Sequence, residues 1–305
     1  MKINCPSSRV LISADEKLLF NVGGTVSIFD ISGEKAVKLK RLNKLRNSSH
    51  IAISFDEKLV AYKNTSGHIA VHEIETGELL LKSKCLAEAG EDLFFINKNK
   101  QILSSEWGGK VFILDIETGD TNVISKFPVS SVNLFSISDD KFILSGSCQN
   151  KYTRIFELSL TEKISSKELY SMPQYMIEDV CVAVSGDDIF FFARSTDCEK
   201  YSIVSFNTST NEMCFCFDID ELLGFKGDLI SEYGYFTSMC VSKDKRYLLI
   251  GMSLSIIVVD LFEKKSVGTI KMDYITSIQF ILSDTKVVIG TWTNIQIIDF
   301  PALIL

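Results

Sequence analysis

A pattern of short apolar runs and polar turns recurs about every forty residues, and it constrains the fold more than any other feature of the chain. Residues 54–83, "SFDEKLVAYKNTSGHIAVHEIETGELLLKS", contain an acidic turn, an apolar run, a glycine turn and a second apolar run that ends in an acid. Six further copies of this order begin at Ser13, Asn97, Ser138, Ser185, Ser242 and Ser283. Self-similarity with a period of this length indicates a repeat architecture.

The residue that closes the second apolar run sets the register of the seven copies. This residue is Asp30, Glu73, Asp115, Glu157, Ser205, Asp260 and Asp299 in turn. The steps between successive positions are 43, 42, 42, 48, 55 and 39 residues. The sequence therefore indicates a period near forty with insertions in two places.

Each copy predicts four β-strands. In the second copy they are "HIAIS", "KLVAYKN", "HIAVHEI" and "LLLKSK", with β-branched residues in the runs and Gly, Asn, Asp and Ser in the turns. Runs such as "DIFFF" and "SIIVV" are apolar at every position, so both faces of these strands need cover. The pattern predicts an all-β fold, a seven-bladed β-propeller with four-stranded antiparallel blades, as one domain over residues 1–305.

The two ends of the chain predict how the last blade is completed. The seventh copy ends soon after "IIDF", so it lacks an outer strand, and "MKINC" at the start has no blade of its own. An N-terminal strand that closes the last blade would remove the open sheet edge.

The repeats resemble the WD40-type β-propeller family over essentially the whole chain. The resemblance rests on the repeat length, the strand number and the acid that ends the third strand, as in "FILDIETG". No copy has Trp-Asp at that position, and only His50 in "SSHIAI" lies near the place of the family's Gly-His. The hydrogen-bond network that these residues build in the family is therefore expected to be absent or replaced.

Composition limits the classes of partner. The formal charge of −7 and the pI near 5.2 argue against a general nucleic-acid binder and favour a basic protein partner. The N-terminus has no apolar segment of signal-peptide length, and the longest uncharged stretch, 247–259, is too short to span a bilayer. We expect a soluble, cytoplasmic protein without membrane association.

The eight cysteines are scattered and include no C-x-x-C pair, which favours buried, reduced thiols over a metal or redox site. No nucleotide-binding or nucleophile-elbow motif is present, and glycines such as those of "VGGTVS" belong to hairpin turns. We predict no cofactor and no resident metal. The three histidines, His50, His68 and His72, are expected at the surface.

In a propeller, the turn between strands two and three and the connection to the next blade share one end of the blade, here called the top. Two insertions fall there. The first, residues 38–50, is basic and includes Arg41, Lys44, Arg46 and His50. It would form either a docking patch for an acidic surface or phosphate, or a solvated outer strand and loop.

The second insertion, residues 217–235, mixes acids with apolar residues. Its candidate partner-binding residues are Asp220, Glu221, Phe225, Asp228 and Glu232, and Asp220 is the expected N-cap of a short helix. The insertion would either project as a lobe toward a basic protein or fold back as a lid on its own blades.

Trp107 and Trp292 end second strands, just before top hairpins. Burial between blades is the simpler expectation, whereas exposed tryptophans would be natural hot spots for a protein partner.

Aligned starts of the innermost strands predict a polar set that faces the central channel: Arg9, His50, Asp92, Asn133, Asp179, Ser238 and Ser277. Asp92, Asn133 and Asp179 are the residues that would supply oxygen ligands to a calcium ion. Water that enters the channel explains polar side chains equally well, and that is the simpler interpretation.

These features favour a non-catalytic protein-binding module that acts by occupying a macromolecular partner. Its sharpest form is an inhibitor or immunity protein that neutralises a basic nuclease toxin by electrostatic steering; a general interaction scaffold is the broader form. The alternative of another class is a calcium-dependent propeller hydrolase or lactonase that uses the channel carboxylates. RNA recognition through residues 38–46 is disfavoured by the net acidity, and self-association is not predicted.

Overall fold

The computed structural model describes residues 1–84, 92–148, 152–161, 163–185, 187–197, 200–224 and 229–304, with the side chains at 131, 178–185 and 215–216 left out. The chain divides into two compact units. Unit 1 comprises Met1–Val10, Glu34–Ala36 and Gln174–Leu305, and unit 2 comprises Leu11–Gly33 and Val37–Pro173. Each unit is described separately, and the single domain over 1–305 stays a prediction.

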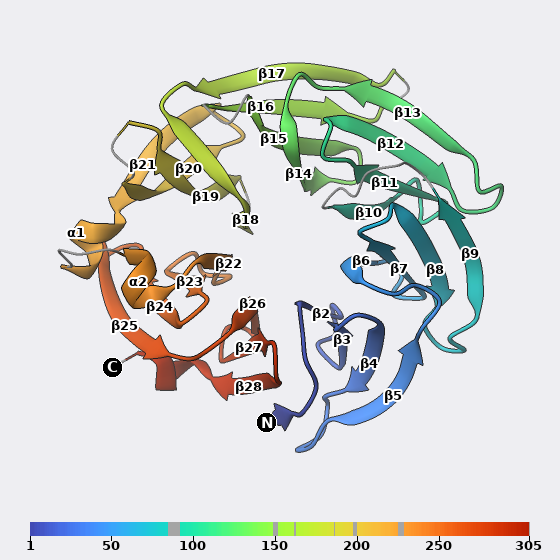
Figure 1. Ribbon diagram of the computed structural model, residues 1–305, viewed down its shortest axis with the longest axis horizontal. Coiled ribbons are helices and arrows are strands. Elements are labelled where there is room, and N and C mark those ends of the chain that lie inside the picture. Colours follow the sequence, from blue (N-terminus) through green and yellow to red (C-terminus); the bar gives the residue numbers. More distant parts are fainter. Residues whose placement is uncertain are drawn as a thin grey trace. The chain divides into compact units, whose positions relative to one another are not determined.

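The described strands form seven antiparallel sheets of four strands, and the chain has the predicted seven-bladed β-propeller fold (Figure 1). Blades one to four lie in unit 2, apart from the first residues of β2. Their strands are, for blade one, β2 (Arg9–Ile12), β3 (Leu18–Val22), β4 (Val26–Asp30) and β5 (Val37–Leu42); for blade two, β6 (Ser48–Ile53), β7 (Leu59–Asn64), β8 (His68–Glu73) and β9 (Leu79–Lys84); for blade three, β10 (Leu93–Ile96), β11 (Gln101–Ser105), β12 (Lys110–Asp115) and β13 (Thr121–Lys126); for blade four, β14 (Ser130–Ser138), β15 (Lys141–Cys148), β16 (Tyr152–Ser159) and β17 (Ser165–Met172).

Blades five to seven lie in unit 1, together with two short helices and a 3-10 turn. Their elements are, for blade five, β18 (Tyr175–Ser185), β19 (Asp188–Ser195), β20 (Tyr201–Asn207) and β21 (Glu212–Asp218), followed by α1 (Ile219–Leu223) and α2 (Leu229–Tyr233); for blade six, β22 (Phe236–Val241), β23 (Tyr247–Met252), β24 (Ser255–Asp260) and β25 (Lys265–Lys271); for blade seven, β26 (Ile275–Ile281), β27 (Lys286–Thr291), β28 (Ile295–Asp299) and β1 (Lys2–Ile3), with η1 (Phe300–Leu303) after β28.

The N-terminal strand completes the last blade, as the sequence predicts. β1 pairs antiparallel with β28, with Lys2 opposite Gln296 and Ile3 opposite Ile295. The backbone N–H of Ile297 donates to the carbonyl oxygen of Met1 at 2.8 Å. The outer edge of β28, which would otherwise be open, is thus paired by the start of the chain.

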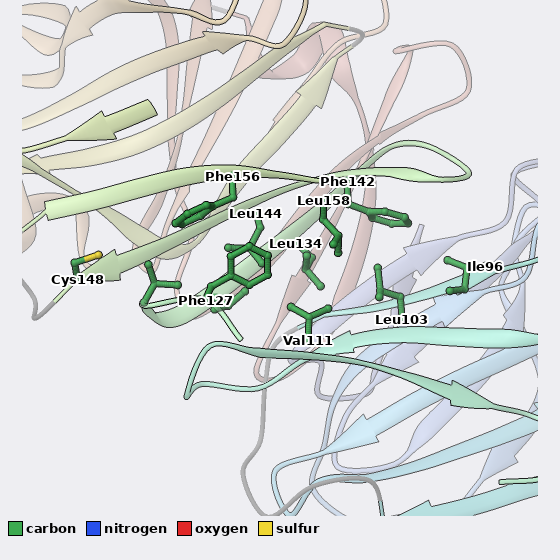
Figure 2. Packing of buried hydrophobic residues seen from close by; sticks show 12 residues of the cluster. Ile96, Leu103, Val111, Phe127, Leu134, Phe142, Leu144, Cys148, Phe156 and Leu158 are labelled. Carbon is green, nitrogen blue, oxygen red and sulfur yellow. The ribbon is translucent and has the colours of Figure 1, made fainter. Parts of the chain in front are cut away.

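The middle strands of the blades are buried on both faces, and this explains their uniformly apolar runs. All six residues of β24 are buried. Its residues alternate between two clusters: Ile257 and Val259 pack with blade five, whereas Ile256 and Val258 pack with blade seven. Blades three and four share a third cluster, which includes Val111 of blade three (Figure 2). In it, Phe127, in the connection between the two blades, and Phe156 of blade four have ring centroids 5.0 Å apart.

The acid that closes the third strand caps the turn to the outer strand. The Oδ1 atom of Asp115 accepts the backbone N–H groups of Glu117 and Thr118, both at 3.0 Å, and Asp260 accepts two in the same way. In blade five the equivalent residue is Asn207, which caps Ser209 and Thr210, and not Ser205 as the sequence register has it. The misalignment arose because β20 ends two residues later than the apolar run suggests.

The turn between the first and second strands also recurs, as Ser-x-Asp. In blade two, Ser54 Oγ donates to Asp56 Oδ1 at 2.7 Å and accepts the backbone N–H of Leu59 at 2.8 Å. Blades one and six repeat these contacts from Ser13 and Ser242. The hydroxyl of Ser54 lowers the pKa of Asp56 by bonding to its ionised form.

A hydrogen bond joins each of two such turns to the next blade. The acceptor is a side-chain oxygen of a residue whose backbone has positive φ. The backbone N–H of Phe55 donates to Asn99 Oδ1 at 3.1 Å, and that of Lys243 donates to Asp284 Oδ2 at 2.6 Å. Asn99 and Asp284 have φ of 66° and 65°. Asn and Asp are the side chains that tolerate this backbone best, so the fastening explains the residue type at these positions.

Replacing Ser54 by alanine removes both contacts of its hydroxyl. We expect Ser54→Ala to lower the free energy of unfolding by about 1 kcal/mol, because the Leu59 N–H loses its acceptor. Urea unfolding followed by circular dichroism measures this change. Ser66→Ala is the control, since Ser66 is exposed and the contact seen for it is through its backbone; equal stability of the two variants would contradict the capping role.

Candidate partner-binding surface

The two tryptophans are exposed, contrary to the expected burial between blades. The exposed fractions are 49% for Trp107 and 65% for Trp292. Each lies in the hairpin between the second and third strands of its blade, beyond the end of the second strand at Ser105 or Thr291. In unit 1, Trp292 stacks on Tyr274, with ring centroids 5.3 Å apart and ring planes 9° apart.

Trp292 belongs to a group of exposed apolar side chains at the top of blades six and seven, here called the aromatic strip. Its members are Tyr235 (71% exposed), Leu254 (37%), Tyr274 (51%) and Trp292. Tyr235 and Tyr274 each lie immediately before the innermost strand of a blade. Burial of such side chains by a partner is the usual source of affinity at protein interfaces.

Backbone hydrogen bonds join the loops that carry the aromatic strip. The N–H of Ser253 donates to Tyr235 O at 2.6 Å, that of Met272 to Leu254 O at 3.0 Å, and that of Trp292 to Tyr274 O at 3.1 Å. The loops are therefore held to one another before any partner arrives, which lowers the ordering cost of binding.

A cavity of about 270 Å³, here called the strip pocket, lies beside Tyr235. It is lined by Phe192, Arg194, Tyr201, Ile230, Tyr235, Phe236 and Met252. Phe192 contacts two of the other rings, with centroids 4.2 Å from Phe236 and 5.3 Å from Tyr201. Arg194 provides the positive charge among these lining residues.

Sequence reasoning missed Tyr235, Tyr274 and the strip pocket. A signal for the two tyrosines was present, because both occupy the same position of the repeat, one residue before the first strand, in "YGYF" and "MDYI". No comparable signal existed for the pocket, whose walls come from blades five and six and from α2.

The second insertion folds back on its own blades. Ile219 of α1 and Leu229 of α2 are buried in the cluster formed with blades five and six. The N-cap of α1 is Asp218, whose Oδ1 accepts the N–H groups of Asp220 and Glu221. The expected cap at Asp220 is thus wrong by two residues, because β21 continues to Asp218 and the helix begins directly after it.

Asp220 and Glu221 lie in the first turn of α1, and burial together with the charge of Asp218 raises the pKa of Asp220. Glu232 of α2 forms an ion pair with Lys271 at 2.8 Å and is exposed. Phe225 and Asp228 lie outside the described residues. Among the acidic candidates, Glu232 lies three positions before Tyr235 in the sequence.

The first insertion forms the outer strand β5 and the loop after it. Arg41 is exposed on β5 and donates from Nε to Thr25 Oγ1 at 3.1 Å, and Lys44 and Arg46 are exposed in the loop. His50 is half-buried on β6, with Nδ1 3.0 Å from Ser49 Oγ. The structure therefore places these residues on an outer strand, a connecting loop and an inner strand of unit 2, and not on one side of a single element.

A buried histidine joins Tyr62 to the turn at Gly77. His72, expected at the surface, is 2% exposed. Its Nδ1–H donates to the Gly77 carbonyl at 3.0 Å, so its Nε2 accepts the Tyr62 hydroxyl at 3.1 Å. Burial raises the pKa of Tyr62, and the nearby backbone of Lys44 and Leu45 opposes this effect. Burial lowers the pKa of His72, and the charge of Lys44 adds to this effect.

Replacing His72 by phenylalanine keeps an aromatic ring but removes both hydrogen bonds. We expect His72→Phe to cost about 1–3 kcal/mol of stability at pH 7.5, since the Gly77 carbonyl and Tyr62 hydroxyl lose their partner. Because the folded-state pKa of His72 lies below 6.5, its stabilising contribution is complete above that pH and is lost as the pH falls toward the folded-state value.

Urea unfolding at pH 7.5 and pH 5 tests both statements. The wild type should lose stability between these pH values by more than His72→Phe does. His68→Gln, on the same strand, should keep the wild-type pH dependence; the same pH dependence in all three proteins would contradict the buried neutral state of His72.

Trp107 lies in a hairpin of unit 2 whose conformation is fixed by an ion pair and by a glycine. Glu106, with its side chain 3% exposed, pairs with Lys110 Nζ at 2.8 Å. Gly109 has φ of 83°, and a Cβ there would lie 2.4 Å from the Phe127 carbonyl oxygen. The position therefore requires glycine, and the hairpin presents Trp107 in a defined place.

Two of the predicted channel residues, Asp92 and Ser238, accept hydrogen bonds from the next blade. The N–H of Leu134, which follows Asn133, donates to Asp92 Oδ2 at 2.6 Å, and the N–H of Ile278, which follows Ser277, donates to Ser238 Oγ at 2.8 Å. Asn133 is buried and Arg9 half-buried. The Asp179 side chain lies outside the description. Asp92 therefore has a structural role, the hydrogen bond to the next blade, that involves no metal ion.

Replacing Asp92 by alanine should destabilise the protein in the absence of any metal ion. We expect Asp92→Ala to cost about 1–3 kcal/mol in buffer with EDTA, and Asp92→Asn, which keeps an acceptor oxygen, to cost less. Thermal unfolding with EDTA and with millimolar calcium measures both effects. Wild-type stability of Asp92→Ala in EDTA, combined with a calcium shift in the wild type alone, would favour the calcium alternative.

Within the described part of the chain, no group of three or more His, Cys, Asp or Glu side chains has the arrangement of a metal site. Of the described cysteines, Cys148 is buried, Cys5 and Cys240 are partly buried, and Cys214 is exposed. Burial raises the pKa of the Cys240 thiol. In the same residues no helix has the length and apolar character needed to cross a membrane.

No protein-family model matches the chain, and no curated protein matches it in sequence. The WD40 resemblance therefore stays a prediction. Among solved structures, the fold is similar to a chain of the Kuenenia stuttgartiensis hydrazine synthase, with a TM-score of 0.77 and 12% identity over 97% of this chain and 96% of that one. Since 1608 chains match in structure, the likeness identifies the fold and selects no activity.

Proposed function

We propose that this chain is a non-catalytic, WD40-like binding propeller that occupies a protein partner through the top of blades six and seven. The observation that carries the proposal is the stacked, exposed pair Tyr274 and Trp292 within the aromatic strip. Large aromatic side chains that stay in water in the free protein are enriched where partners bind. A propeller fold also suits a binding or scaffold role, because its loops vary on a rigid frame.

The net charge of −7 supports a basic partner, since opposite charges accelerate encounter. The sharpest form of the function is inhibition of a basic nuclease toxin, as an immunity protein does. That form requires the purified protein to block the nuclease activity of its captured partner; a captured partner without such activity would leave the scaffold role.

Capture experiments with matched baits test the binding surface. We expect the double variant Tyr274→Ala, Trp292→Ala to lose about 2 kcal/mol or more of binding free energy, or at least about thirtyfold in Kd, because it removes the exposed ring pair. Proteins captured from the native cells by the wild type are identified, and Kd values are then measured with the purified partner.

Phe262→Ala is the matched control. Phe262 is 72% exposed and lies in the turn between the third and fourth strands of blade six, at the opposite end of that blade. The control should bind as tightly as the wild type. Equal loss in both variants, or no loss in the double variant, would overturn the assignment of the surface.

A further inference from the structure

The strip pocket combines an apolar wall with a guanidinium group. Ile230 and Phe236 supply partly exposed apolar surface, and Phe192 and Met252, which are 0% and 1% exposed, are buried next to Phe236. Arg194, on β19 opposite Tyr201, has Nη2 4.0 Å from Met176 Sδ. The ligand that such a site recognises must therefore present apolar surface and an acceptor for arginine together.

The size of the strip pocket limits what enters it. Sites for small-molecule ligands typically enclose about 300–1,000 Å³, and the strip pocket has about 270 Å³. It suits one large side chain, and the exposed surface of the aromatic strip continues from Tyr235 outside it. A ligand that fills the pocket and also covers the strip is an extended peptide segment.

Arginine specifies the acceptor. Its planar guanidinium matches a carboxylate with two parallel hydrogen bonds, and the pairing strengthens in apolar surroundings. A carboxylate from a neighbouring acidic residue is difficult to place, because successive side chains of an extended segment point to opposite sides, and those two positions apart are separated by about 6.6 Å. Only the last residue of a chain carries its side chain and a carboxylate on the same carbon.

We infer that the strip pocket binds the C-terminal residue of a partner protein, with a large apolar side chain against Ile230 and Phe236 and the terminal carboxylate on Arg194. The preceding residues of the partner lie along the aromatic strip. This inference rests on the proposed function, which it extends by giving the chemistry of the partner's anchoring segment.

Methyl NMR with two small probes tests the pocket. The probes are N-acetyl-phenylalanine and N-acetyl-phenylalaninamide, which share the side chain and differ in the carboxylate. In protein labelled with ¹³C-methyl methionine, we expect the acid to shift the Met252 resonance, identified through Met252→Leu, and the amide to bind at least about tenfold more weakly. The resonance of Met172, which ends β17 in unit 2, is an internal control.

Arg194→Gln should abolish the preference for the acid and leave apolar binding in place. Lys265→Gln, which removes a charge from exposed β25, should keep the preference. Equal binding of acid and amide by the wild type would overturn carboxylate recognition, and this comparison needs no variant. Absence of any Met252 shift with either probe would overturn the pocket itself.

A lysine-containing tetrapeptide ending in phenylalanine distinguishes a protein C-terminus from a free acid. It should bind more tightly than N-acetyl-phenylalanine, and Trp292→Ala should weaken the peptide alone; equal affinities would indicate a site for small acids and overturn the inference. If neither probe shifts Met252 but the Tyr274, Trp292 double variant still loses the captured partner, this inference alone is rejected. If the acid probe shifts Met252 but the double variant retains the partner, the proposed binding surface is rejected instead.

Discussion

Burial of the middle strands on both faces is the constraint on which the rest of the structure depends. β24 illustrates it, because its alternate residues enter two different clusters, one with blade five and one with blade seven. A strand of this kind cannot lie at a surface, so blade six needs a neighbour on either side. Side chains such as Asp92 and Asn99 then fasten backbone groups of adjacent blades, and the loops at the blade ends are held on a fixed frame.

Much of this fold could be predicted from the sequence. The repeat period and the four strands of each copy follow from apolar runs and turn residues, whose signals are local. The pairing of the first residues with the last blade follows from the outer strand that the seventh copy lacks. The register at Asn207 and the cap at Asp218 could not be placed, because strand ends depend on pairing with a partner strand. The prediction that His72 lies at the surface failed for a related reason. A single polar residue in a sequence is expected to be exposed, and its partners Tyr62 and Gly77 are known only from the fold.

The candidate surface was predictable in part. The sequence identified Trp292 and Glu232 as candidates at the top of a blade. It did not identify the stacking partner Tyr274, although Tyr274 and Tyr235 occupy the same position of the repeat. The aromatic strip depends on the spatial order of three loops, and the strip pocket on the packing of α2 against two blades. Single-sequence reasoning has no access to either arrangement.

The pairing of β1 with β28 has a consequence for how the protein is made. Lys2 and Gln296 are 294 positions apart in the sequence, so their encounter closes a very long loop and follows the local hairpins in time. Until then blade seven has three strands, and the edge of β28 offers unsatisfied backbone groups to any other nascent chain. Newly synthesised molecules are thus most vulnerable to intermolecular mispairing in the interval before the first residues find their place.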